Sequence, residues 1–363
     1  ANREELEEII NFQLKGLAEK LPATLPGDHE NKADWERLFQ LAKEFKHLAP
    51  WKWLNDDQIF AVELPNGEYA FCSIMGAAGQ EFGIAAFIGH EGLTYLKRLL
   101  LTEGIDETAL YENRSLIFEL CNRKELSKRD YELIKKTNIS FRGKKSWPIF
   151  RAMEPGYFPW YLTDEEAAVM TIILERAVEI GKRTKESLTI QRFGAANVCF
   201  AQKLVPAPGG GTKWEDSFIS LSSAKPNKEA QVPINEVHVH RLKKTLKKFH
   251  IPIEIGIFHS PTPVREHINE RPFLPTVFVA AEKEHEMALF HDMIEPEDRD
   301  QRIQGAFLKM LEKLNYIPVE IWLEKKIVPI LAPITKKLAI TVIEKDTLQI
   351  IEEIKRTMYK QMG

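Results

Sequence analysis

The chain of 363 residues is long enough for two or three domains, and its 44% hydrophobic and 28% charged residues are typical of globular proteins. A net charge of −3 gives the whole chain no electrostatic attraction to nucleic acid or anionic membranes. No apolar run approaches the roughly 18 residues of a membrane-spanning helix, and the acidic N-terminus is unlike a signal peptide. We therefore expect a cytoplasmic protein that does not bind membranes.

The three cysteines, Cys72, Cys121 and Cys199, lie far apart in apolar, strand-like runs. They form no C-x-x-C pair, so they lack the spacing of a metal or redox motif. We predict that they are buried, reduced thiols, as is usual for cytosolic proteins.

The first half of the chain alternates between helical and strand patterns. Glycines at 76 and 79 lead into another strand rather than a helix, so we interpret them as turn residues and not as a phosphate loop. The pattern predicts helices over residues 2–20, 35–45, 91–101 and 128–137, and strands over residues 59–64, 69–75, 82–88 and 116–121.

Residues 147–160 contain three prolines, five aromatic residues and two opposite charges. They fit either an aromatic groove in which Arg151 anchors an anion, or a rigid edge strand packed on the core. We favour the second interpretation. It predicts that Trp147, Phe150 and Phe158 are mostly buried and that Arg151 pairs with an acid. Thr163 is then expected to cap a long helix.

The domain organisation follows from a change of pattern after this helix. Residues 186–234 are rich in strand signals and end in a polar stretch, which is typical of a connecting segment. We predict an N-terminal α+β domain over residues 1–185, a β-rich connecting segment over 186–234, and a C-terminal α/β domain over 235–363. The border lies between residues 182 and 233.

The C-terminal half has the clearest architecture in the sequence. Helices that join strands at this spacing usually give parallel pairing with right-handed crossovers. The whole protein is therefore predicted to be of mixed α/β class, with two domains that each hold a mixed sheet. The predicted order is strands 253–258, 276–281 and 286–291, helix 298–314, strand 319–323, helix 327–338, strand 340–343 and a final helix to about residue 360.

This order, βββαβαβα, resembles the ribonuclease H-like fold. The stretches 253–258, 271–275 and 279–282 are similar to the start of a transposase or integrase core, and the whole chain resembles a group of uncharacterised bacterial proteins that carry such a core. In that fold, acids lie on the first strand, near the fourth strand and on a later helix. The resemblance places Gly256 at the first-strand acid position, Glu282 at the end of a following strand and Glu324 at the end of the fourth.

Two functions of different class follow from these residues. Gly256 supplies no ligand, and Glu254 lies two residues back, about 7 Å away on the same face. We therefore favour a non-catalytic interaction or scaffold module that binds no cofactor and has a protein as its partner. The alternative is a phosphodiesterase or nuclease that uses Mg²⁺ or Mn²⁺ held by rearranged acids. Its candidate acids are Glu254, Glu282, Asp292 and Glu324.

Histidines are concentrated between positions 238 and 291. His238 and His240 share one face only if they lie in a strand, where they suit one metal ion together with Glu282 or Asp292, and His259 or His291 are further candidates. In a helix, residues two apart point in different directions. The apolar residues that follow favour a helix that starts near His240, so we interpret these histidines mainly as surface residues.

Lys243, Lys244, Lys247 and Lys248 are predicted to form one basic face of this helix. Such a face is able to bind the phosphates of a nucleic acid. A charge run on an amphipathic helix is more often simply solvated, and the sequence shows no aromatic platform beside it. We retain these four lysines as candidates for nucleic-acid binding.

Overall fold

The computed structural model describes residues 32–101, 111–222, 233–267, 270–284 and 287–362. The helix predicted over residues 2–20 lies outside these ranges. The chain forms two compact units, each with its own hydrophobic cores, which confirms a mixed α/β protein of two domains. The N-terminal unit comprises Ala1–Pro155, Pro159–Asn227 and His267–Arg271, and the C-terminal unit comprises Gly156–Phe158, Lys228–Glu266 and Pro272–Gly363.

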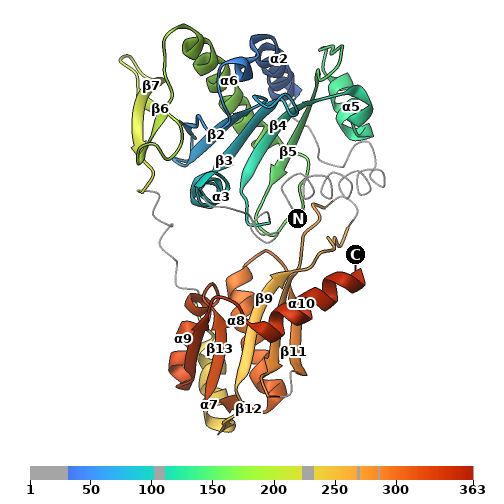
Figure 1. Ribbon diagram of the computed structural model, residues 1–363, viewed down its shortest axis with the longest axis vertical. Helices are drawn as coiled ribbons and strands as arrows, with labels where there is room; N and C mark the ends of the chain where they lie inside the picture. The colour runs from blue at the N-terminus through green and yellow to red at the C-terminus, as the bar shows by residue number, and fades with distance from the viewer. Residues whose placement is uncertain (1–31, 102–110, 223–232, 268–269, 285–286, 363) are drawn as a thin grey trace. The chain divides into compact units, whose positions relative to one another are not determined.

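The N-terminal unit is built on a seven-stranded mixed sheet with the order β5-β4-β3-β2-β1-β6-β7 (Figure 1). A tight turn joins β1 to β2, and Gly67 in this turn has a φ of 82°, which glycine adopts without strain. The strands are β1 (Phe60–Glu63), β2 (Tyr69–Met75), β3 (Gly83–Ile88), β4 (Ser115–Cys121), β5 (Trp147–Met153), β6 (Val198–Pro206) and β7 (Thr212–Ser220).

Helices cover both faces of this sheet. The long pair α2 (Lys32–Leu48) and α6 (Asp164–Glu186) packs against the larger core on one face, and α3 (Gly89–Leu101) packs against a smaller core on the other. Thr163 caps α6 as predicted, because its hydroxyl accepts a hydrogen bond from the amide of Glu166. The short helix α5 (Lys128–Lys136) follows β4 in the chain.

The predicted connecting segment 186–234 is organised differently from our expectation. β6 pairs in parallel with β1, with Phe60 opposite Phe200, so β6 and its hairpin partner β7 belong to the N-terminal sheet. Cys199 and Ala201 of β6 complete the smaller core beneath α3. The strand signals of this segment correspond to β6 and β7, but the sequence did not indicate their pairing, because a parallel partner so far away in the chain leaves no local signal.

The C-terminal unit contains a five-stranded sheet with the order β11-β10-β9-β13-β14. β10 runs antiparallel to both of its neighbours, whereas β13 is parallel to β9 and to β14. The strands are β9 (Ile253–His259), β10 (Thr276–Glu282), β11 (Met287–Ile294), β13 (Glu320–Glu324) and β14 (Thr341–Lys345), and a separate small sheet consists of β8 (Lys247–Phe249) and β12 (Tyr316–Pro318).

The two faces of this sheet carry different helices (Figure 1). The last helix, α10 (Gln349–Met362), packs alone on one face, over β9 and β10. The other face is covered by α7 (Glu236–Thr245), α8 (Arg299–Leu314) and α9 (Val328–Leu338), which enclose the main core of the unit. Among the described residues, no helix is long and apolar enough to cross a membrane.

Candidate functional site

The central strand β9 is buried along its whole length, and its face toward α10 contains the two positions that matter for an acidic site. Gly256 lies directly beneath α10. A Cβ atom at this position would lie 2.6 Å from Cγ2 of Ile351, which is far inside van der Waals contact. Ile351 is only 1% exposed and β-branched, so it has little freedom to move away. The helix therefore occupies the space that a first-strand carboxylate would need.

Glu254, the other acid candidate on this strand, binds the helix instead of facing a cavity. It is 4% exposed, and its carboxylate accepts a hydrogen bond from the amide of Ile350 at 3.2 Å, at the start of α10. Burial raises the pKa of Glu254, although this backbone hydrogen bond acts in the opposite direction. Glu254 is thus an N-terminal cap of α10, supplied by a distant strand.

Glu324 lies on the same face of the sheet, at the end of β13. Its Oε1 atom would be 3.3 Å from a Cβ at Gly256, so this carboxylate is next to the first-strand position. Glu324 is 7% exposed and forms an ion pair of 2.9 Å with Lys326. A neighbouring lysine thus balances the charge that a metal ion would otherwise neutralise.

The remaining two acid candidates lie on the opposite face. Glu282 is opposite Ile253 in the register, and neighbouring residues of a strand point to opposite faces, so Glu282 points away from Glu254. Asp292 is opposite Phe278, which lies four residues before Glu282 on β10, a distance of about 13 Å along the strand. Asp292 also pairs with Lys309 at 3.2 Å. The four acids therefore do not converge on a common site.

The histidine candidates are also separated. His238 lies in α7, which begins at Glu236 and not near His240, and its Nε2 is 2.9 Å from the carboxylate of Glu312. His240 is exposed two residues further along the same helix and points in another direction. Neither histidine forms a ligand group with Glu282 or Asp292 among the described side chains. Both histidines lie in a helix, so their rings point in different directions, as expected for that case.

The other two histidines do not complete a site with Glu282. His259 is opposite Thr276 at one end of β10, whereas Glu282 lies at the other end of that strand. His291 is opposite Val279 on the α10 face, so it points away from Glu282. Burial, followed by the charges of Arg299, Lys326 and Lys355, lowers the pKa of His259 to about 4, so its ring is neutral at pH 7.

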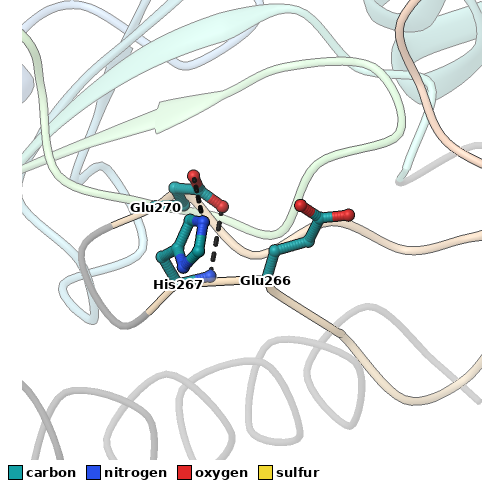
Figure 2. A group of neighbouring side chains, drawn as sticks. All are labelled: Glu266, His267 and Glu270. Carbon is teal, nitrogen blue, oxygen red and sulfur yellow. Dashed lines mark hydrogen bonds and ion pairs between the residues drawn. The ribbon is translucent and has the colours of Figure 1, made fainter.

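One group of described side chains has ligand atoms close enough together for a metal ion, and it lies in an exposed loop. The ligand atoms of Glu266, His267 and Glu270 all lie within 4.8 Å of one another. The contacts drawn within the group join His267 and Glu270 (Figure 2). The backbone amide of His267 donates to the Glu270 carboxylate at 3.2 Å, and Nε2 of His267 lies 4.0 Å from Oε1 of Glu270. These are ordinary contacts of a polar turn, so the group needs no ion to explain it.

The four candidate lysines do not form one helical face, which corrects the sequence-based expectation. α7 ends at Thr245, so it contains only Lys243 and Lys244. Lys247 and Lys248 belong to β8, which pairs with β12. The strand pairing brings Phe249 beside Tyr316, with ring centroids 5.5 Å apart. Sequence analysis missed this aromatic pair because its two rings lie 67 residues apart in the chain. The only signal in the sequence was a phenylalanine directly after two lysines.

In the N-terminal unit, Arg151 makes the acid pairing that we predicted. Its guanidinium donates two hydrogen bonds, of 2.8 and 2.7 Å, to the carboxylate of Asp130 and also lies against the ring of Tyr161. Burial tends to raise the pKa of Asp130, but Arg151 and the hydrogen bonds from Ser127 together outweigh it and hold the pKa below its usual range. Phe150 is buried as expected, as is Phe158, which belongs to the C-terminal unit, and Trp147 is half-buried.

A small pocket next to this ion pair is lined by Trp35, Phe39, Phe150 and Tyr161, together with Asp130. Asp130 is bound to Arg151 and, through a capping box, to Ser127 at the start of α5. Both charged groups are therefore engaged in structural contacts. This agrees with the interpretation of residues 147–160 as a packed edge strand.

The three cysteines are buried and unpaired, as predicted. Burial raises the pKa of Cys121 and of Cys199 to about 12, so neither thiol is a thiolate at neutral pH. They are therefore poor nucleophiles and poor metal ligands.

Comparison with known families also divides the chain into two parts. Residues 35–202 match the model of a domain of unknown function, DUF7309, and residues 238–359 match that of a second, DUF6930. The first match ends within β6 and the second includes the five-stranded sheet. No curated protein matches the chain.

Proposed function

We propose that the C-terminal unit is a ribonuclease H-like core that has no catalytic activity and serves as an interaction module. The elements β9, β10, β11, α8, β13, α9, β14 and α10 follow one another along the chain in the order expected from the resemblance, which supports this assignment. The three buried, unpaired thiols of the N-terminal unit favour a reducing compartment such as the bacterial cytoplasm.

One observation carries the proposal. α10 packs so closely on Gly256 that even a Cβ atom would collide with Ile351 at 2.6 Å. Two-metal phosphoryl transfer requires several carboxylates around a pair of ions roughly 4 Å apart. Here the first-strand ligand is missing, Glu254 is used as a helix cap, and Glu282 lies on the other face of the sheet.

A nuclease assay tests the proposal directly. Purified full-length protein is incubated with single- and double-stranded DNA and RNA in the presence of Mg²⁺ or Mn²⁺, and we expect no metal-dependent cleavage. Cleavage that is lost in Glu324→Ala or Glu282→Ala would contradict the proposal and establish the alternative, a metal-dependent phosphodiesterase. Cleavage that persists in both variants would come from a contaminating enzyme.

A further inference from the structure

The basic run at residues 243–250 forms a continuous exposed surface on the C-terminal unit. It contains four lysines and His250 but no acid, and apart from Leu246 every residue is exposed. Lysines near a helix C-terminus stabilise the helix dipole, which accounts for Lys243 and Lys244. The same explanation does not apply to Lys247 and Lys248, which lie beyond the end of α7 in an exposed strand.

The small sheet adds an aromatic surface to these charges. Lys247 is opposite Tyr316 in the parallel register, and Phe249 is opposite Pro318, so these side chains share one face of the small sheet. Phe249 is 49% exposed, and its ring meets that of Tyr316 edge to face at an interplanar angle of 62°. A half-exposed phenylalanine held in a fixed orientation by a neighbouring ring, within a run of lysines, has the form of a stacking platform.

Two further helices end near the small sheet and have lysines in their last turns. Lys248 points to the other face of the small sheet from Lys247 and Phe249, and there it donates a hydrogen bond to the carbonyl of Ala339, where α9 ends, with Lys336 in the last turn of that helix. α8 ends just before Tyr316 and has Lys313 in its last turn. Burial, followed by the charge of Glu282, raises the pKa of Tyr316, so the surface also includes an acid.

We propose that this platform, formed by Lys243, Lys244, Lys247, Phe249 and Tyr316, binds single-stranded nucleic acid. The lysines would contact backbone phosphates, and the exposed ring of Phe249 would stack on a base. A single strand fits better than a duplex because its bases are free to stack on a side chain. The inference rests on the proposed function, since it names the partner class of a module that binds without cleaving.

The test measures binding by fluorescence anisotropy, with full-length protein, EDTA and a labelled oligonucleotide of about 12 nucleotides. We expect single-stranded DNA or RNA to bind more tightly than a duplex of the same sequence, and binding to weaken as salt rises. Changing Lys243, Lys244 and Lys247 together to alanine should reduce the slope of log K against log[salt] by about 2, because each phosphate contact on a single strand contributes about 0.7.

The aromatic contribution is tested separately. Phe249→Ala should weaken binding roughly 5- to 100-fold, which corresponds to the loss of one stacked base. Phe249→Leu keeps an apolar side chain and thus the fold, but should lose most of the same affinity. Phe218→Ala is the matched control, because Phe218 is also an exposed phenylalanine, 68% exposed on β7 of the other unit, and this change should leave binding unaltered.

Three results would overturn the inference: no binding at low salt, equal binding of duplex and single strand, or unchanged affinity in Phe249→Leu. Displacement of the oligonucleotide by polyglutamate as effectively as by unlabelled oligonucleotide would assign the platform to an acidic protein instead. EDTA removes divalent ions, so no metal-dependent cleavage occurs in the binding test. Failure to bind would overturn this inference alone, whereas only metal-dependent cleavage in the nuclease assay would contradict the non-catalytic proposal.

Discussion

Glu254 and Asp130 are both buried acids, and both stabilise the N-terminus of a helix. Glu254 accepts the amide of Ile350 in α10, and Asp130 caps α5 through Ser127 while binding Arg151. A buried carboxylate therefore does not by itself indicate catalysis in this protein, because helix amides and a guanidinium are sufficient to hold it.

Glu119 on β4 differs, because nothing comparable stabilises its charge. Burial, followed by the nearby charge of Glu81, raises its pKa from the ordinary 4.5 to about 7. The protonated acid thus favours the folded state, and this contribution is lost as pH rises through about 7. We predict that Glu119→Gln raises the free energy of unfolding at pH 8 by up to about 3 kcal/mol, and at pH 5 by less than about 1 kcal/mol.

Urea denaturation of both proteins at the two pH values measures this difference. Glu353→Gln, the same change at an exposed residue of α10, is the matched control and should leave the profile unchanged. Equal stabilisation by Glu119→Gln at pH 5 and pH 8 would contradict the assignment of a raised pKa.

Sequence reasoning at the scale of single residues succeeded where the partner is local. The cap at Thr163 binds an amide three residues away, and the pattern of a hydroxyl before three acids predicts it. The pairing of Arg151 with an acid was expected, but Asp130 was not identified as that acid. The cap of α10 by Glu254 spans 96 residues, so nothing near either residue signals it.

At the scale of elements, the contact between α10 and β9 closes the face of the sheet on which Gly256 lies. Gly256 permits the close approach of the helix because it has no side chain. We predict that Gly256→Ala lowers the free energy of unfolding by about 1–3 kcal/mol, since the added methyl group overpacks a buried interface. Gly256→Asp, which restores an acid to the first strand, should be more destabilising because it also buries a charge.

Gly305 offers a matched control for this prediction. It lies within α8, and a Cβ atom added there would have no neighbour within 4 Å. Gly305→Ala should therefore stabilise the protein by up to about 1 kcal/mol, because alanine favours a helix over glycine. Thermal unfolding of both variants provides the measurement, and a Gly256→Ala protein as stable as Gly305→Ala would show that α10 does not pack tightly on β9.

The elements themselves were predicted well from their patterns, whereas their pairing was predicted only in part. The core strands and helices of the C-terminal half appear in the expected order, because runs such as 276–281 are apolar enough to mark a buried strand. The lysine helix was extended too far, since Leu246 continues the helical apolar spacing although the chain turns into β8 after Thr245.

At the scale of the whole molecule, the hairpin of β6 and β7 completes the N-terminal unit. A fragment that ends at residue 185 lacks the parallel partner of β1 and three buried residues of the smaller core, Cys199, Ala201 and Leu221. We predict that a fragment of residues 1–222 unfolds cooperatively in urea, whereas residues 1–185 do not fold or are insoluble. A cooperative transition of equal midpoint in the shorter fragment would contradict this account and restore the predicted border.

The central claim is that α10 closes the acidic site of the C-terminal unit, and Mn²⁺ binding tests it most directly. Electron paramagnetic resonance measures free Mn²⁺ during titration with the full-length protein and with Glu324→Gln, which removes the only candidate acid beside Gly256 among the described residues. We predict that the two titrations coincide, because Glu324 is held by Lys326 and the other candidate acid on its face, Glu254, is bound to the amide of Ile350. Mn²⁺ bound by the wild-type protein and released in Glu324→Gln would contradict the claim.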